Sequence, residues 1–471
     1  MTLPIPSQAT LARLTALKQS PAGKRVGVLG LGVSGKAMAL YLARRGAKVV
    51  GVDAKSDVPA AAELRAAGVE LRLGAVTVER TNDLDGLLLS PGVDPRQPAV
   101  AALLARGVPV FGELELTSPL PAKVAGITGT NGKSTTTGLL GALVQGAGLR
   151  AFVGGNFGEP VCTWLDRGEA ADVAVIELSS FQLETVFTFA ADVAVELNVT
   201  PDHLDRYDGL GGYARAKQRL VETLSPTGVA VLAHEDAAVR AMAGATRGKV
   251  WWLATRGGPV QGHGAWLDGN TMVTVGEPSD LGRIDLSHPR LFGRHNRENA
   301  IAAFLSARAL GITDALALTR AYQAFEGLEH RLELAGDVNG VRFINDSKAT
   351  NDDAADIAVA AMDRPTLLLL GGHSKGGGYA GVLGAAPGKV KVVVAYGEAR
   401  EEIAAAFASH PGLVVAPTIA QAFREAVARA VSGDTVLLAP ACSSYDEFTD
   451  YTQRGRTFKR WVRELGEGKL P

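Results

Sequence analysis

From residue 25 onward the chain repeats one alternation. Short runs rich in Val, Ile and Leu, beginning with "RVGVLG", alternate with Ala-rich amphipathic stretches. Apolar runs of this length are typical of parallel strands buried on both faces, and the stretches between them are typical of crossover helices. The pattern predicts an α/β protein.

Chain length and two breaks in this alternation predict three domains. A chain of 471 residues corresponds to three domains at roughly 150 residues each. The first block of strands ends before the proline-punctuated "TSPLPAK", and the second leads into "FEGLEHRLELAG". We therefore expect domains over residues 1–118, 119–329 and 330–471, with a strand-rich patch at about 249–293 in the second.

Charge, cysteine content and hydropathy exclude several classes of protein. The 48 Lys and Arg balance 49 Asp and Glu, so nothing in the whole-chain charge favours nucleic acid or an anionic membrane. Cys162 and Cys442 have no partner at metal-ligand spacing and are expected to be buried, reduced thiols. The N-terminus lacks the apolar core of a signal peptide, and no stretch is apolar enough to span a membrane. We expect a cytoplasmic protein with no nucleic-acid partner and no stable membrane association.

The strongest local motif is "GITGTNGKST". Gly126, Gly132, Lys133 and Ser134 fit the phosphate-binding pattern G-x-x-x-x-G-K-[ST] directly after an apolar run. The glycines let backbone N–H groups turn toward an anion, the lysine brings positive charge to the outer phosphates, and the serine hydroxyl can complete a Mg²⁺ shell. The motif predicts a site for ATP and Mg²⁺.

A second glycine-rich turn occurs in "VLGLGVSG". Gly30, Gly32 and Gly35 fit G-x-G-x-x-G after an apolar run, and Asp53 ends the next such run. Alone, this pattern suggests a nicotinamide-dependent dehydrogenase. Because the same turn can hold any nucleotide diphosphate at a helix N-terminus, the motif leaves the nucleotide open.

Two further residues are candidates for metal binding. Glu177 ends the apolar run of "DVAVIELSS", where α/β sheets present ligand-binding residues, so it can ligate a metal that bridges ATP phosphates. His203 lies in the loop-like "NVTPDHLDRYDG" and can be a ligand or an acid–base group. The alternatives are an ordinary surface acid and a solvated loop histidine.

The stretch "YARAKQRLVETL" predicts a helix with a lysine on its apolar face. Lys217 shares this face with Tyr213, Leu220, Val221 and Leu224. Burying an unpaired ammonium costs several kcal/mol, so such a lysine either extends its charge into water or becomes neutral through a lowered pKa.

The order of the motifs resembles that of the Mur ligases of bacterial cell-wall synthesis. The matching stretches are "GITGTNGKST", "ELSSFQL", "NVTPDHLDRY", "YARAK", "HNRENAIAA", "EHRLE" and "INDSKATN". Together with "APACSSYDEF", "NDSKATN" is most similar to the member that joins D-glutamate to UDP-N-acetylmuramoyl-L-alanine. The resemblance extends from residue 25 to about 461. It implies a Rossmann-like UDP-binding N-terminal domain, a P-loop ATP-binding central domain, a Rossmann-like amino-acid-binding C-terminal domain, and a monomer with these two small-molecule substrates.

The resemblance also implies roles for individual residues. For the UDP-substrate they are Gly32, Val33, Ser34, Asp53, Lys55, Ser90, Gly92 and Asn156. For ATP they are Gly129, Thr130, Asn131, Gly132, Lys133, Ser134, Thr135, Asn296, Asn299, Arg331, Asp346 and Lys348. For D-glutamate they are Thr350, Lys375, Ser444 and Tyr451. Three positions depart from the family pattern, with Ala54 in place of threonine, Tyr451 in place of phenylalanine and His373 in place of aspartate.

In this family the lysine of the "YARAK"-like helix is carbamylated, which implies a carbamate on Lys217. Reaction of a neutral amine with CO₂ replaces a cation with an anionic ligand that can hold Mg²⁺. The implied metal ligands are Ser134, Glu177, His203 and Lys217, and the implied catalytic residues are Lys133, His203 and Lys217. Metal ligation by His203 would exclude its use as the base that deprotonates the incoming amine.

Two other functions stay open. The first is another ATP-dependent amide ligase, either a sister Mur ligase or an enzyme like folylpolyglutamate synthase, although the chain lacks their "DNPR" and "DGAHNP" stretches. The second is a sensor that binds ATP and a UDP-sugar without forming an amide.

Overall fold

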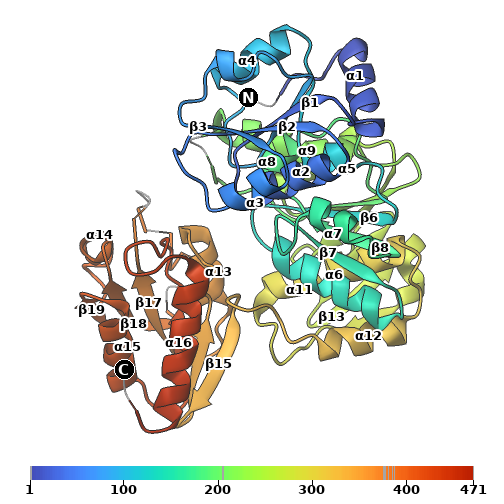
Figure 1. The fold of residues 1–471 in the computed structure, drawn as a ribbon. Coiled ribbons are helices and arrows are strands. Elements are labelled where there is room, and N and C mark those ends of the chain that lie inside the picture. Colours follow the sequence, from blue (N-terminus) through green and yellow to red (C-terminus); the bar gives the residue numbers. More distant parts are fainter. Residues whose placement is uncertain are drawn as a thin grey trace. The chain divides into compact units, whose positions relative to one another are not determined.

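The computed structural model describes residues 3–203, 206–374, 378–379, 381–384, 386 and 388–469. The chain divides into two compact units, one formed by Met1–Asp285 and Asn299–Gln323 and the other by Leu286–Glu298 and Ala324–Pro471. The first unit contains two sheets and the second contains one (Figure 1).

The N-terminal sheet is parallel, with the strand order β3-β2-β1-β4-β5. Neighbouring residues of one strand pack on opposite faces, since Val28 belongs to one apolar core and Leu29 to the other. The strand order reverses between β1 and β4, so the loops that follow these two strands lie side by side. Ligands usually bind at this position in such sheets. The strands are β1 (Arg25–Leu29), β2 (Lys48–Asp53), β3 (Glu70–Leu73), β4 (Gly86–Leu89) and β5 (Val110–Phe111), and the helices are α1 (Gln8–Gln19), α2 (Val33–Arg44), α3 (Ala61–Ala66), α4 (Pro98–Ala105) and α5 (Glu113–Thr117).

The central sheet has the order β14-β13-β12-β11-β10-β9-β6-β8-β7, and its strands run in one direction except for β13, which is antiparallel to β12 and β14. The strand that precedes the phosphate-binding motif, β6, lies between β9 and β8. The strands are β6 (Lys123–Thr128), β7 (Ala151–Gly155), β8 (Val173–Glu177), β9 (Val193–Glu196), β10 (Val229–Ala233), β11 (Lys249–Ala254), β12 (Gly264–Asp268), β13 (Thr271–Val275) and β14 (Arg283–Asp285). The helices are α6 (Lys133–Gly146), α7 (Val161–Arg167), α8 (Ser180–Leu183), α9 (Gly209–Glu222), α10 (Ala237–Ala241), α11 (Gly293–Ala309) and α12 (Ala315–Ala324).

The C-terminal sheet has the order β15-β16-β20-β17-β18-β19, with only β15 antiparallel to its neighbour. Leu368 and Leu370 face one core, and Leu367 and Leu369 face the other. The strands are β15 (Glu333–Val338), β16 (Val341–Asn345), β17 (Thr366–Gly371), β18 (Val390–Tyr396), β19 (Leu413–Ala416) and β20 (Thr435–Leu438), and the helices are α13 (Asp352–Ala361), α14 (Arg400–Ala406), α15 (Ile419–Arg429) and α16 (Tyr451–Gly466).

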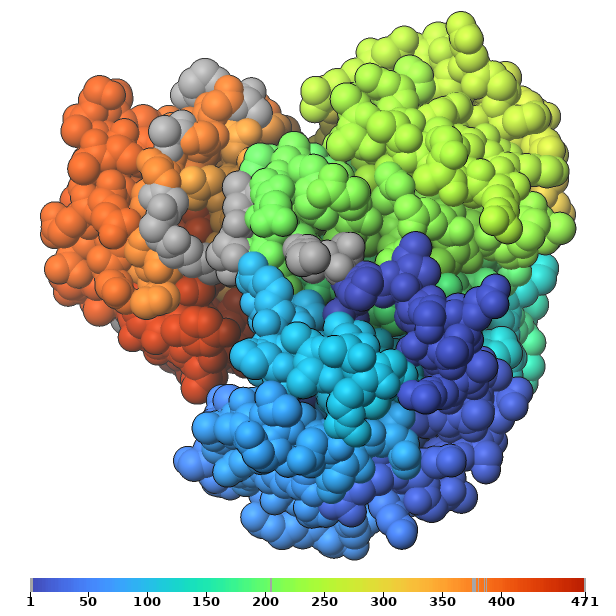
Figure 2. Space-filling model, turned by 90° about the horizontal axis from the view of Figure 1, so that it is seen from above, coloured from blue at the N-terminus to red at the C-terminus, as the bar shows by residue number. Residues whose placement is uncertain are grey.

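Polar contacts join the N-terminal and central sheets within the first unit. The buried carboxylate of Glu115 accepts hydrogen bonds from the N–H groups of Phe187 and Thr188, both at 2.7 Å. Asp166 of α7 pairs with Arg44 and Arg45 at the end of α2, each at 2.6 Å. Figure 2 shows the blue surface of the N-terminal part adjoining the green surface of the central part.

The predicted α/β class with three sheet-containing regions is confirmed. The boundaries after residues 118 and 329 stay predictions. Cys162 and Cys442 are buried free thiols, as expected. Over the described ranges, no helix is both long and apolar enough to cross a bilayer.

Candidate active site

The phosphate-binding motif forms the predicted strand, loop and helix. The loop Gly129–Gly132 joins β6 to α6, and its two glycines have φ of +147° and +87°, values that other residues rarely adopt. A Cβ atom on Gly132 would lie 2.3 Å from Oδ1 of Asn299. Asn299 therefore lies against the loop, and position 132 requires glycine.

A second loop, which follows β9, holds the phosphate-binding loop in place. The N–H of Thr130 donates to the carbonyl of Asn198, and the N–H of Asn131 donates to Oδ1 of the same residue, both at 2.8 Å. The N–H of Thr200 donates to Oγ1 of Thr130 at 3.0 Å. These bonds preorganise the loop.

Two lysines meet at one carbonyl of this loop. Nζ of Lys133 donates to the carbonyls of Gly129 and Thr130, at 2.8 and 2.7 Å. Nζ of Lys217 donates to the same Gly129 carbonyl at 2.8 Å and to Oγ1 of Thr128 at 3.2 Å. The lysine on the apolar face of α9 therefore points at the phosphate-binding loop.

The side chain of Lys217 is almost completely shielded from solvent. The lysine is 1% exposed, which excludes a side chain that extends into water. Burial, reinforced by the charge of Lys133, lowers the pKa of Lys217 to about 7, although Glu196 opposes the shift. Burial therefore favours the neutral amine over the ammonium. The other residues predicted on this face are also buried, namely Tyr213, Leu220, Val221 and Leu224, the last lying just beyond the end of α9.

Glu177 ends β8 beside the strand that leads into the phosphate-binding loop. It is 2% exposed, and in the strand register it neighbours Ile127. Its Oε1 accepts a hydrogen bond from Nδ2 of Asn156 at 2.7 Å, and its carbonyl accepts one from the N–H of Asn156 at 2.9 Å. The structure thus joins a predicted metal ligand to a residue predicted to bind the UDP-substrate.

The donor set fits a Mg²⁺ ion that arrives with a nucleotide. Ser134 and Thr135, both buried, occupy the first turn of α6, and Ser134 and Glu177 offer oxygen ligands. Among the described residues, no three His, Cys, Asp or Glu side chains lie close enough together to hold a metal ion. Mg²⁺ in nucleotide sites takes few protein ligands and completes its shell with phosphate oxygens and water, so these oxygens suit it.

His203 lies in the loop after β9, with a side chain that is 43% exposed and a φ of +53°. Its ring lies 4.7 Å from that of Phe181 and 6.1 Å from that of Tyr213. The Tyr213 ring also contacts the buried lysine, since Nζ of Lys217 lies 4.8 Å from the centre of that ring. His203 thus belongs to the same corner of the central sheet as the buried lysine.

One buried acid in this corner was not predicted from the sequence. Glu196, the last residue of β9, is fully buried and is the register partner of Thr128, so their side chains share the sheet face that carries Lys217. Neither carboxylate oxygen has a hydrogen-bond donor in the described part of the chain. Burial raises the pKa of Glu196 to about 7 against the influence of Lys217 and Lys133. An acid that ends the apolar run of "DVAVELNVT" is the same signal that indicated Glu177.

The residues predicted for the UDP-substrate gather at the carboxyl ends of β1, β2 and β4. Gly32 is the N-cap of α2, followed by the exposed Val33 and the half-buried Ser34. The carboxylate of Asp53 accepts the N–H of Leu31 at 2.7 Å and the N–H of Lys55 at 2.9 Å. Asp53 therefore fixes the loops after β1 and β2. After β4, Ser90 and Gly92 follow, and the N–H of Ser90 donates to the Leu29 carbonyl at 3.0 Å.

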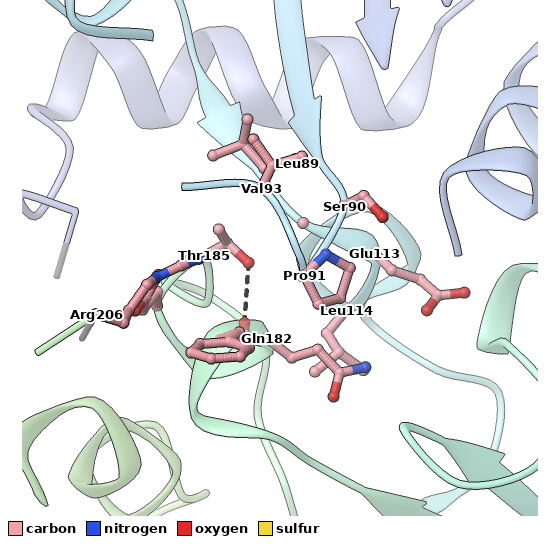
Figure 3. A pocket seen from close by; sticks show the side chains of 12 residues that line it. Leu89, Ser90, Pro91, Val93, Glu113, Leu114, Gln182, Thr185 and Arg206 are labelled. Carbon is pink, nitrogen blue, oxygen red and sulfur yellow. Dashed lines mark hydrogen bonds and ion pairs between the residues drawn. The ribbon is translucent and has the colours of Figure 1, made fainter. Parts of the chain in front are cut away.

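A narrow cleft in the first unit runs between the N-terminal and central sheets (Figure 3). Ser90 and Pro91 belong to the "SPG" stretch that was predicted for the UDP-substrate, whereas the lining residues of the segments 112–114 and 181–185 and Arg206 were missed because they are far from it in the sequence. Arg206 pairs with the buried Glu184 at 2.6 Å, and Oε1 of the buried Glu113 accepts the N–H of Cys162 at 2.9 Å. The lining residues are Leu89, Ser90, Pro91, Val93, Gly112, Glu113, Leu114, Phe181, Gln182, Glu184, Thr185 and Arg206.

In the second unit, the predicted C-terminal residues follow β16 and β20, which are neighbours. Nζ of Lys348 lies 5.2 Å from the centre of the Tyr451 ring. Burial raises the pKa of Asp346 to about 7, and the positive charge of Arg331 opposes part of this shift. Ser444 is 2% exposed and Thr350 is half-buried. In the same unit, Nδ2 of Asn296 donates to the carbonyl of Phe292 at 2.8 Å. Lys375 lies outside the described residues.

Three family models match in succession. They describe the MurD-like N-terminal domain of Mur ligases over residues 24–112, the Mur ligase middle domain over 127–307, and the Mur ligase glutamate ligase domain over 330–442. The chain is 41% identical over 464 residues to a UDP-N-acetylmuramoylalanine–D-glutamate ligase of Anaeromyxobacter dehalogenans, covering 94% of this chain and 98% of that one. It is 40% identical over 460 residues to one of Pelotomaculum thermopropionicum, with the same coverage.

Solved structures share the fold at lower identity. The UDP-N-acetylmuramate–alanine ligase MurC of Thermotoga maritima matches with a TM-score of 0.58 and 18% identity, over 95% of this chain and 100% of that one. MurF of Acinetobacter baumannii matches with a TM-score of 0.58 and 16% identity, over 99% of both chains. By its matching domains and its relatives, the chain belongs to the Mur ligase family.

Proposed function

We propose that the chain is an ATP-dependent ligase that joins D-glutamate to UDP-N-acetylmuramoyl-L-alanine in peptidoglycan precursor synthesis. Relatives named for this reaction, at 41% and 40% identity over 94% of the chain, support the choice of substrates. The structural observation that carries the chemistry is the meeting of Lys133 and Lys217 at the Gly129 carbonyl, beside the acid that ends β8.

A carboxylate is a poor electrophile, because attack adds a second negative charge to it. In the proposed reaction, the alanyl carboxylate of the acceptor attacks the γ-phosphoryl group of ATP, and ADP leaves. The amine of D-glutamate then attacks the acyl phosphate, and the tetrahedral intermediate collapses with loss of phosphate. Lys133, which ends in the phosphate-binding loop, stabilises the charge on the transferred group.

Ser134 and Glu177 are the residues proposed to hold Mg²⁺, which neutralises phosphate charge when bound. We propose that Lys217 is carbamylated. The neutral amine forms an N–C bond with CO₂ and releases a proton, and the product is an anion. Burial of Lys217 and its lowered pKa support this step, since they favour the neutral amine.

Several assignments stay predictions. His203 is proposed either as a metal ligand or as the base that takes the proton of the D-glutamate amine. The C-terminal roles also rest on the resemblance, whereas the cytoplasmic location is a prediction from the sequence, and the monomeric state stays a prediction. These roles concern Asn296, Arg331, Asp346 and Lys348 for ATP, and Thr350, Lys375, Ser444 and Tyr451 for D-glutamate.

A panel of amino acids tests the proposal. The protein is mixed with ATP, Mg²⁺ and UDP-N-acetylmuramoyl-L-alanine, and phosphate release is followed after addition of D-glutamate, L-glutamate, L-lysine or glycine. Release with D-glutamate alone is the expected result. Release with L-lysine or glycine but not with D-glutamate would assign the chain to a sister ligase, and ATP binding without any amide product would indicate a sensor.

A further inference from the structure

The guanidinium of Arg454 lies buried beneath the loops of the C-terminal sheet. Arg454 belongs to the first turn of α16, and it is only 1% exposed. Its hydrogen-bond acceptors within the described residues are all neutral oxygen atoms. Burying a cation among neutral partners costs free energy, so its retention calls for a role that an apolar side chain would not fill.

Four hydrogen bonds from this guanidinium join two loops. Nε donates to Oγ of Ser347 at 3.0 Å, and Nη2 donates to the Ser347 carbonyl at 2.8 Å. Nη2 also donates to the carbonyl of Cys442 at 3.1 Å, and Nη1 donates to that of Ser443 at 3.2 Å. Ser347 follows β16, whereas Cys442 and Ser443 follow β20. Arg454 therefore ties together two strand-end loops that are far apart in the sequence.

A third loop, which follows β17, also lies against the Arg454 guanidinium. Gly372 follows β17 with a φ of +135°, and a Cβ atom there would lie 2.3 Å from the Ser443 carbonyl oxygen and 3.1 Å from Nη1 of Arg454. The N–H of His373 donates to the Ser443 carbonyl at 2.9 Å. Three loops at the carboxyl edge of the sheet thus share Arg454 as their common contact.

The tied residues neighbour those predicted to bind the amino acid. Ser347 precedes Lys348, and Ser443 precedes Ser444. Oγ of Ser347 also donates to the carbonyl of Tyr451 at 2.8 Å, so the same hydroxyl connects Arg454 to the start of α16. A change at Arg454 would shift these flanking residues together.

We propose that Arg454 is the positioning residue of the amino-acid pocket, because it ties together the loops that carry residues predicted to bind D-glutamate. Guanidinium is suited to this role because its planar donors fix several acceptors at once. The inference rests on the proposed function, because the pocket residues are those predicted for D-glutamate.

Variants of Arg454 and Ser347 test this role through the KM for D-glutamate. Arg454→Lys keeps the charge but loses the fixed geometry, and we expect the KM to rise about tenfold. Arg454→Met loses both, and we expect about a hundredfold rise. Ser347→Ala removes the Nε partner and the bond to Tyr451, and we expect a severalfold rise. Arg456→Lys, an exposed arginine on the same helix, is the matched control and should leave the KM within about twofold.

Two further measurements separate positioning from general damage. The affinity for UDP-N-acetylmuramoyl-L-alanine, measured by calorimetry, should stay unchanged, and methylguanidinium should lower the raised KM of Arg454→Ala. A wild-type KM in folded Arg454→Lys and Ser347→Ala would overturn the proposal, as would an equal loss of affinity for both substrates. If the Arg454 variants do not fold, Ser347→Ala decides. If the wild-type protein uses another amino acid, the proposed function fails, and the KM for that amino acid tests Arg454 in the same variants.

Discussion

Nζ of Lys217 donates a hydrogen bond to the carbonyl of Gly129 at 2.8 Å, which places a buried amine of α9 against the phosphate-binding loop. A lysine that only packed its methylene groups on the apolar face would extend its amine into water and would not contact this loop. The contact joins the helix pattern to the glycine motif in one corner of the central sheet.

Replacing Lys217 should nearly abolish turnover, because the proposed carbamate is lost. We expect kcat to fall about a hundredfold or more in both Lys217→Ala and Lys217→Arg. A short carboxylate such as acetate should partly restore the alanine variant, in which the space is free, but not the arginine variant, which keeps a cation. Phosphate release with and without acetate measures this, and full activity of Lys217→Ala would reject the carbamate.

Alanine substitutions in the glycine loop after β1 should show whether steric clash or helix propensity determines stability there. A Cβ atom on Gly35 would lie 1.8 Å from the backbone oxygen of Gly30, whereas one on Gly32 meets no atom within 4 Å. Helix propensity alone predicts that Gly35→Ala stabilises the protein, but the backbone clash should destabilise it by about 2 kcal/mol. Scanning calorimetry should show a clearly lowered transition for Gly35→Ala and a much smaller decrease for Gly32→Ala, which loses only the preference of the N-cap for glycine over alanine. A raised transition for Gly35→Ala would contradict the packing of this loop.

Glu113 should make stability depend on pH. Burial raises the pKa of Glu113 to about 7 from an ordinary value of 4.5, so the folded state holds its proton over a range in which the unfolded state has released it. The stability is therefore fully present below about pH 4.5 and declines as the pH rises through 7, by an amount on the order of 3 kcal/mol. Glu113→Gln removes this decline. Chemical denaturation at pH 5, 6, 7 and 8 should show the variant gaining stability relative to the wild type, and parallel curves would contradict the prediction.

Much of the candidate site could be predicted from local sequence patterns. The phosphate-binding loop, Glu177 and the buried face of α9 could be predicted because each is encoded within one short stretch: a strand, a turn or a helical period. The placement of Lys217 could be predicted only as a choice between water and a pKa shift, and its burial decided the choice.

The remaining features depend on contacts between distant segments. Glu196 reaches the lysine corner only because β9 pairs with β6 in a register that sets it beside Thr128. Arg454 and Ser347 are 107 residues apart, and the cleft in Figure 3 gathers residues from several loops. Periodicity and motif spacing carry no information about such pairings.

Transfer of the γ-phosphoryl group to the acceptor carboxylate can be followed with oxygen-18. UDP-N-acetylmuramoyl-L-alanine labelled in its alanyl carboxylate is incubated with the protein, ATP, Mg²⁺ and D-glutamate, and the phosphate and amide products are analysed by mass spectrometry. An acyl phosphate leaves one carboxylate oxygen on phosphate, so we expect a labelled phosphate for each amide formed. Amide formation with unlabelled phosphate would contradict the proposed chemistry.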